Sequence, residues 1–259
     1  MSTERSTKTS RPRSPFDARG LARLARRAGA IAIDNAATTS GTRPPAERVT
    51  RAIESWISRE AQTSQPRTRV ALTHETGPLP KADWVLSVDA IDGLDAYLAG
   101  LPTWAVSLGL LYRGEPFSAA VYAPALRDLY VASSGTLRWQ GRAVTADATK
   151  EPSRFVLGTG LEKRSILRLR RRREAEGPIF YHACLVARGA AEGAVLGRLN
   201  HRQAATLAAL LGPVGGELVS VRTGKPLDLT SLLLGRSTRD PILATGAGRA
   251  EALFSRLKK

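Results

Sequence analysis

The sequence predicts an α/β protein built of layered sheets and divided into two lobes. Two amphipathic helical patterns come first, five strand-like segments follow one another, and helical and strand-like patterns alternate after residue 150. The 259 residues are enough to bury a substantial core. We expect a basic, disordered tail at residues 1–15, an N-terminal α+β lobe at 16–150 and a C-terminal α/β lobe at 151–259.

Two helices are expected at the start of the first lobe. Asp17 is a typical N-cap residue, and apolar residues recur every three or four positions over residues 21–37. Pro44 and Pro45 suit the start of a second helix over residues 46–62. The apolar face of this second helix is formed by Val49, Ile53, Trp56 and Ile57.

The strand-like segments of the first lobe are rich in β-branched and aromatic residues. They cover residues 68–73, 84–88, 103–112, 117–124 and 128–133. The turn YRGEP between the third and fourth of them is typical of a hairpin.

In the second lobe, strands are expected at 155–160, 217–221 and 242–246, and helices at 166–176, 202–212 and 248–259. Residues 183–196 should begin as a helix and end as a strand.

The charge of the chain is its unusual property. Thirty-nine Lys and Arg against 23 Asp and Glu give a formal net charge of +16, which attracts anionic partners over a distance. An arginine-rich sequence can also result from the base composition of the genome. The charge is therefore compatible with two explanations, binding of an anionic partner or base composition alone. Seven of the eleven residues at 163–173 are basic. They form either a solvated helix face or a contact for nucleic-acid phosphates through Arg170, Arg171, Arg172 and Arg173.

The sequence has only one cysteine and no long apolar run, and this excludes several classes of protein. The lone Cys184 excludes an intramolecular disulfide and a cysteine-based zinc site, and it fits a reducing, cytoplasmic setting. No apolar run approaches the ~20 residues of a membrane span. The N-terminus also lacks the apolar region of a signal peptide, so no membrane partner is expected.

Residues 89–95, DAIDGLD, place three carboxylates around a glycine directly after the apolar run WVLSV. This order would put Asp89 at the end of a strand and Asp92 in the turn beyond it. Both carboxylates and the Ile91 carbonyl could then converge on a hard cation such as Mg²⁺. Because Asp and Gly are also common turn formers, the motif alone leaves an ordinary turn open.

The region from Asp89 to Gly135 resembles the inositol monophosphatase family. That family has D-P-I-D-G-T-x-N-F, then G-x-P before a V-S strand, then G-V-V-Y-x-P and an E-x-Y-x-A strand ending in Gly. The matching residues here are Asp89, Ile91, Asp92, Gly93, Gly100, Pro102, Val106, Ser107, Tyr122, Pro124, Tyr130, Ala132 and Gly135. The likeness extends from residue 18 to 257, and Glu75 stands where the family has the first Glu of G-E-E.

The resemblance implies an α-β-α-β-α sandwich and a Mg²⁺-dependent phosphomonoesterase, usually a homodimer, that acts on an inositol, sugar or nucleotide phosphate. Glu75, Asp89 and the Ile91 carbonyl would hold the metal that activates the attacking water. Asp89 and Asp92 would contribute to a second metal, and the catalytic residues would be Glu75 and Asp92. The residues expected beside the substrate phosphate are Gly93, Leu94, Asp95 and Arg202.

Several polar residues of the family are replaced. The threonine after D-G, which helps to orient the attacking water, is Leu94, a side chain that forms no hydrogen bond. Ile53 stands where the second Asp of D-x-V-T-x-x-D belongs, and Thr76 replaces the second Glu of G-E-E.

The family's Asp in W-D-x-A-A, a ligand of the second metal, is also missing. Arg202 or Gln203 takes its place, depending on the alignment, and no Asp or Glu occurs between residues 192 and 217. An arginine there would repel Mg²⁺ and could occupy the place of the cation as an ion pair with Asp92. We therefore expect a single Mg²⁺ site or none.

Three functions remain open. The first is Mg²⁺-dependent hydrolysis of a small phosphomonoester with weakened activity. The second is a catalytically degenerate family member, a pseudoenzyme, that serves as a nucleic-acid- or protein-binding scaffold. The third is binding of a phosphate ligand without turnover, with Arg202 holding the anion. His74, His182 and His201 match no catalytic residue of the family and are expected to be structural or exposed.

Overall fold

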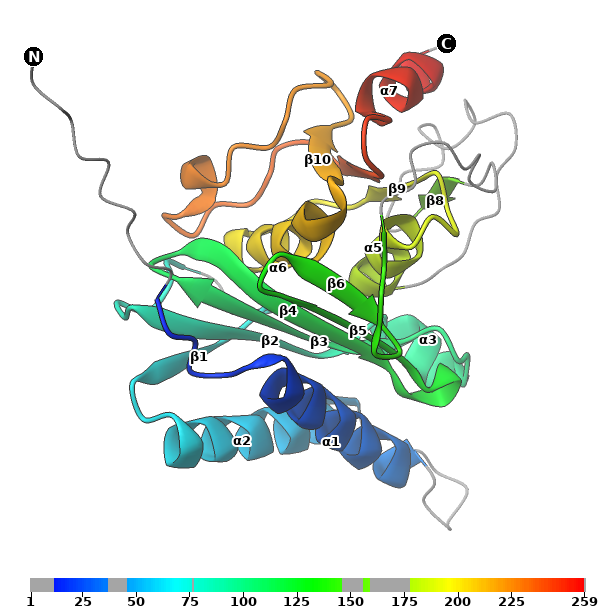
Figure 1. Ribbon diagram of the computed structural model, residues 1–259. Coiled ribbons are helices and arrows are strands. Elements are labelled where there is room, and N and C mark those ends of the chain that lie inside the picture. Colours follow the sequence, from blue (N-terminus) through cyan, green and yellow to red (C-terminus); the bar gives the residue numbers. More distant parts are fainter. Residues whose placement is uncertain (1–11, 37–45, 76, 146–155, 159–177, 259) are drawn as a thin grey trace, which may run out of the picture.

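The computed structural model describes residues 12–36, 46–75, 77–145, 156–158 and 178–258. The expected helix at 166–176, which includes Arg170 to Arg173, lies outside them. The described elements form five layers, two of sheet between three of helix, and the predicted layered α/β fold is confirmed (Figure 1).

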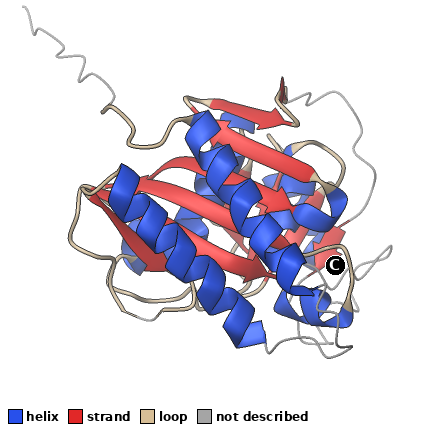
Figure 2. Cartoon of the chain, turned by 90° about the horizontal axis from the view of Figure 1, so that it is seen from below, coloured by secondary structure: helices blue, strands red, loops and turns tan. Residues whose placement is uncertain are grey.

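The outer helical layer consists of α1 (Ala18–Ala36) and α2 (Ala46–Ser64), which lie across one face of the first sheet (Figure 2). Asp17 caps α1 as predicted, since its Oδ1 accepts a hydrogen bond of 2.7 Å from the Gly20 N–H. Val49, Ile53 and Ile57 are buried on the sheet side of α2. The predicted helices and the apolar face of the second are therefore confirmed.

The first sheet has seven strands in the order of the sequence. They are β1 (Thr68–Leu72), β2 (Trp84–Asp92), β3 (Ala105–Tyr112), β4 (Glu115–Ala123), β5 (Asp128–Ser133), β6 (Thr136–Trp139) and β7 (Arg142–Ala143). β1 pairs parallel with β2, and every other neighbouring pair is antiparallel. The predicted hairpin joins β3 to β4, where Arg113 and Gly114 have φ of 52° and 85°.

The structure corrects the end of β2. The strand was expected to stop near Asp89, but it continues to Asp92 through a register shift between these two residues. Asp92 is therefore the last residue of the strand rather than part of a turn. A bulge of this kind redirects a side chain at the end of a strand. Gly93, with φ of 86°, then leads into the short helix α3 (Leu94–Ala99).

The central helices and the second sheet complete the sandwich. Helices α5 (Ile179–Ala187) and α6 (His201–Leu211) lie between the two sheets. The strands of the second sheet, in spatial order, are β10 (Glu217–Ser220), β11 (Ile242–Thr245), β9 (Gly193–Leu196) and β8 (Val156–Gly158). Helix α7 (Ala250–Lys258) covers the outer face of this sheet, where Leu253 packs on Val195, Val219 and Leu243. No helix in the described ranges is long and apolar enough to cross a membrane.

Helix α6 approaches the first sheet very closely. A Cβ atom added to Gly109 of β3 would lie 1.9 Å from Thr206 Oγ1 of α6. Only a glycine therefore allows this packing distance. The contact places the first turn of α6 beside the loop between β1 and β2, where the candidate site lies.

The buried His182 of α5 makes stability depend on pH. Burial lowers its pKa from 6.5 to about 4. As the pH falls from about 6.5 to about 4, the unfolded chain binds a proton at this residue and the folded chain does not, so stability falls. We expect a loss of about 3 kcal/mol across this range, at about 1.4 kcal/mol per pKa unit.

Urea unfolding of the natural chain and of His182→Gln at several pH values measures this contribution. The difference between the two proteins isolates His182 from the carboxylates, which titrate in the same range. Identical pH dependence of the two unfolding free energies would contradict the prediction.

Candidate functional site

Several elements meet around a cavity of about 410 Å³. Of the predicted site residues, Asp89, Ile91 and Leu94 line it. The other lining residues are Glu47, Thr50, Arg51, Glu54, Thr73, His74, Ala90 and Gln203. The cavity therefore joins α2, the loop after β1, the end of β2 and the first turn of α6.

Asp92 does not line this cavity, because it is turned toward the start of α5. Its Oδ1 accepts a hydrogen bond of 3.1 Å from the Ile179 N–H, and its Oδ2 accepts one of 2.8 Å from the Phe180 N–H. Burial, followed by the charge of Asp89, raises the pKa of Asp92 well above its usual value, and these N–H groups oppose the shift. Asp92 thus caps a helix 87 residues away in the sequence.

Gly93 allows this capping contact. Its φ of 86° favours glycine, and a Cβ there would come within 3.1 Å of the Pro178 side chain. Asp95 is exposed in the first turn of α3, where a negative charge stabilises the helix. Neither residue lines the cavity.

Arg202 is buried and binds the loop that follows β1. Its Nη1 donates hydrogen bonds to the carbonyl oxygens of Glu75 (3.0 Å) and Gly77 (3.4 Å), and its Nη2 donates to that of Pro78 (3.3 Å). The predicted ion pair with Asp92 is therefore wrong. Asp92 already accepts two N–H groups, whereas three converging carbonyls suit the fixed fork of a guanidinium.

Asn200, at the start of α6, also binds the loop that follows β1. Asn200 and Gln203 form a capping box, with hydrogen bonds of 3.0 Å and 3.1 Å between side chain and backbone in both directions. Asn200 Nδ2 also donates to the Thr73 carbonyl at 2.6 Å. Sequence reasoning missed Asn200, although the spacing of Asn and Gln is the signature of a capping box.

Glu75 is folded back onto its own loop. Its Oε2 accepts a hydrogen bond of 3.0 Å from the Leu72 N–H. Its backbone carbonyl is one of the three that Arg202 binds. Glu75 does not line the cavity.

Glu54 and His74 form an acid–base pair at the cavity that sequence reasoning missed. Glu54 Oε1 lies 3.2 Å from His74 Nδ1, and the two side chains are 11% and 62% exposed. Burial raises the pKa of Glu54, His74 opposes the shift, and Asp89 and Glu75 add to it. Burial also raises the pKa of Asp89. The sequence did contain a signal for Glu54 as a site residue, because it directly follows Ile53, which stands where the family has an Asp.

Residues 18–249 match the profile of the inositol monophosphatase family. The chain belongs to this family. Over 79 residues it is 35% identical to the putative Nus factor SuhB of Neisseria meningitidis, which covers 30% of each chain. Over 78 residues it is 37% identical to the inositol-1-monophosphatase of Rhizobium meliloti, which covers 30% of this chain and 29% of the relative. These matches therefore span less than a third of each relative's own length.

Solved structures of the family share the fold. An IMPase from Thermotoga maritima superposes with a TM-score of 0.75 at 20% sequence identity, covering 91% of this chain and 94% of that one. At this level of identity the likeness concerns the fold alone.

The family is Mg²⁺-dependent, and the residues of this member do not fit its metal centre as they lie. Asp89 faces the cavity, while the oxygens of Asp92 and Glu75 accept backbone N–H groups elsewhere. Within the described residues, no three His, Cys, Asp or Glu side chains are grouped as a metal-ligand set. Arg202 brings a positive charge to the start of α6, which adds to the mismatch.

A second polar network positions α5. The carboxylate of buried Asp128, which stands at the Glu of the family's E-x-Y-x-A, accepts hydrogen bonds from Tyr130 OH (3.1 Å), Tyr181 OH (3.0 Å) and Trp139 Nε1. The Arg188 guanidinium lies 4.4 Å from the centre of the Trp139 ring. Burial raises the pKa of both tyrosines, which therefore remain hydrogen-bond donors. The network joins the sheet to the helix whose N-terminus Asp92 caps.

Proposed function

We propose that this chain is a binding member of the inositol monophosphatase family that recognises phosphate-bearing partners and hydrolyses phosphomonoesters weakly or not at all. The position of Arg202 carries the proposal. This buried guanidinium, bonded to three carbonyls, stands at one of the two adjacent positions, Arg202 and Gln203, at which the resemblance places a carboxylate of the second metal ion. A positive charge at that place opposes the binding of a cation.

The other changes in the site support the same proposal. Asp92 and Glu75 accept backbone N–H groups, and neither side chain lines the cavity. Leu94 presents methyl groups to the cavity where the family has a hydroxyl. The cavity retains Thr50, Gln203 and Arg51, which can donate hydrogen bonds to an anion, and Arg51 also pairs with Glu47 at 3.4 Å. The volume of the cavity suits a small phosphorylated ligand.

The names of the relatives are compatible with a binding role. The Neisseria protein is named a putative Nus factor, whereas the Rhizobium protein is named a phosphatase. With a net charge of +16, this chain has nucleic acid, or an assembly carried by nucleic acid, as its proposed partner. A homodimer is part of the proposal and is checked by light scattering of the purified chain.

Slow hydrolysis is the second candidate, and the Glu54–His74 pair favours it. The pair borders the cavity together with Asp89. Either member could accept the proton of an attacking water as a general base, because both lie at the surface that a bound phosphate would meet.

Phosphate release separates the two candidates. The natural chain, Asp89→Asn and His74→Gln are incubated with Mg²⁺ and a panel of inositol, sugar and nucleotide monophosphates. The binding proposal expects the same background release from all three proteins. It also expects calorimetry to show inorganic phosphate binding that Arg51→Gln weakens.

Mg²⁺-dependent release that Asp89→Asn abolishes would overturn the binding proposal. Loss of that release in His74→Gln as well would assign the general base. Absence of phosphate binding by the natural chain would also count against the proposed role of the cavity.

A further inference from the structure

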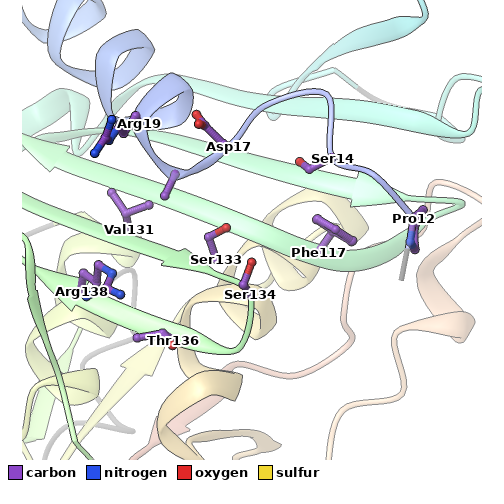
Figure 3. A pocket seen from close by; sticks show the side chains of 11 residues that line it. Pro12, Ser14, Asp17, Arg19, Phe117, Val131, Ser133, Ser134, Thr136 and Arg138 are labelled. Atoms are coloured by element: carbon purple, nitrogen blue, oxygen red, sulfur yellow. The ribbon is translucent and has the colours of Figure 1, made fainter. Parts of the chain in front are cut away.

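A second cavity, of about 570 Å³, lies away from the candidate site. One of its walls is the segment that leads into α1, and the other is the face of β4, β5 and β6 beside that helix (Figure 3). This cavity shares no lining residue with the candidate site, and its volume lies within the range of small-ligand sites.

Two arginine side chains border the cavity on either side of Val131. Arg138 of β6 is the register partner of Val131, so the Cβ atoms of these two residues lie about 5 Å apart on one face of the sheet. Val131 belongs to the buried cluster against which Ala18 of α1 packs, and Arg19 directly follows Ala18. Figure 3 shows Val131 between the two arginines. Because both side chains are long, a ligand above Val131 would lie within reach of both guanidinium groups.

The two guanidinium groups have no partner among the residues that the structure describes. Arg19 and Arg138 are exposed, and neither forms an ion pair with a described acidic residue. Asp17 is the one acidic residue that lines the cavity, and its Oδ1 accepts the Gly20 N–H at the N-cap of α1. Two positive charges therefore accompany one negative charge, and the excess of positive charge attracts an anion.

Hydroxyl groups border the same cavity along the turn between β5 and β6. Ser133 and Thr136 are register partners, so they lie on the face of the sheet that carries Arg138. Ser134 and Gly135 form the two-residue turn between them, with φ of 52° and 74°. A hydroxyl donates one hydrogen bond and rotates to suit its acceptor. Guanidinium and hydroxyl groups together suit a phosphate, because its oxygens accept several hydrogen bonds at once.

We propose that this cavity binds the phosphate group of a small molecule, or inorganic phosphate itself. The phosphate lies above Val131, where Arg19 and Arg138 donate hydrogen bonds to its oxygens and Thr136 donates from the same face of β6. The charge of Asp17 opposes binding. The proposal goes beyond the proposed function, because it adds a second anion site that does not involve the first.

Nuclear magnetic resonance of the ¹⁵N-labelled full chain, titrated with inorganic phosphate at constant ionic strength, tests the proposal. The amide signals of Ser134, Gly135 and Thr136 should shift along a saturable curve. Arg19→Gln/Arg138→Gln should raise the Kd obtained from these shifts about tenfold, because it removes both cations that contact the phosphate. Circular dichroism melts of each variant confirm that it folds.

Three further variants separate specific contacts from general charge. Arg48→Gln/Arg59→Gln, the matched control at exposed positions of α2, removes the same charge and should change the Kd less than about twofold. Asp17→Asn keeps a good N-cap side chain but removes the negative charge, so it should lower the Kd about threefold. Thr136→Val keeps the shape of the side chain but loses the hydroxyl, so it should raise the Kd about threefold.

Other ligands distinguish the sources of the phosphate. Glycerol phosphate binding at the same amides with a lower Kd than inorganic phosphate would assign the site to a phosphorylated small molecule, and a higher Kd would assign it to the free ion. The proposal would be overturned if these amides did not shift, if the two arginine pairs lost equal affinity, or if acetate bound as tightly as phosphate. A single-stranded RNA that shifts these amides when inorganic phosphate does not would also overturn it. The Gln203 amide reports on the candidate site in the same titration, so failure of either site is observed separately.

Discussion

Arg202→Ala is expected to lower the free energy of unfolding by about 3 kcal/mol. The change removes a buried guanidinium and leaves the carbonyls of Glu75, Gly77 and Pro78 without their donor. Hydrogen bonds to a charged group contribute about 1.5–3 kcal/mol, and the emptied volume of the buried side chain adds to the cost of its removal. Urea denaturation measures the loss, and exposed Arg198→Ala is the control, expected to change stability by less than about 0.5 kcal/mol.

A second variant shows whether the hydrogen bonds or the volume of Arg202 matter. Arg202→Met keeps most of the side-chain volume but donates nothing, so it should remain destabilised by about 2 kcal/mol. A methionine variant as stable as the natural chain would show that the three carbonyls do not need the guanidinium. It would remove the main support for a structural role of this residue.

Asp128→Ala is expected to lower the free energy of unfolding by about 4 kcal/mol, because it leaves three donors, two of them buried, without their acceptor. Hydrogen exchange should also accelerate at the Ile179 and Phe180 amides, since the network holds the helix whose first turn Asp92 caps. Asp34→Ala, at an exposed position of α1, is the matched control and should be nearly neutral.

A double-mutant cycle isolates the network. Asp128→Ala and Trp139→Phe remove two partners of one hydrogen bond, so their combined cost should be smaller than the sum of the separate costs. Strict additivity, or an unchanged exchange rate at the two amides, would show that Asp128 does not couple the sheet to α5.

The arrangement of layers could be predicted because each signal for it is local. The cap at Asp17, the apolar face of α2 and the hairpin at Arg113–Gly114 depend on residues a few positions apart. The strands β6 and β7 were missed because they contain only four and two residues, too few to show alternation. The end of β2 was missed because a bulge interrupts its pattern.

The candidate site was predicted less well, because its contacts join distant parts of the chain. The position of Asp92 in the motif was clear, but its partners lie 87 and 88 residues further on. Arg202 was expected to find a carboxylate, and the carbonyls it binds are 124 to 127 residues away. Backbone carbonyls are present at every residue, so no side-chain pattern marks which of them will converge.

The hydrogen bonds from Arg202 to the loop after β1 also affect how this chain can evolve. An acidic side chain in place of Arg202 would remove the positive charge next to the cavity residue Gln203 and, in the same step, release the loop that carries Glu75. If the chain hydrolyses phosphomonoesters weakly or not at all, as we propose, an exchange of Arg202 that favours metal binding would pass through a less stable protein. Because selection removes destabilised proteins, this cost favours keeping Arg202. The loop that carries Glu75 is then kept for its contribution to stability, whether or not it contributes to catalysis.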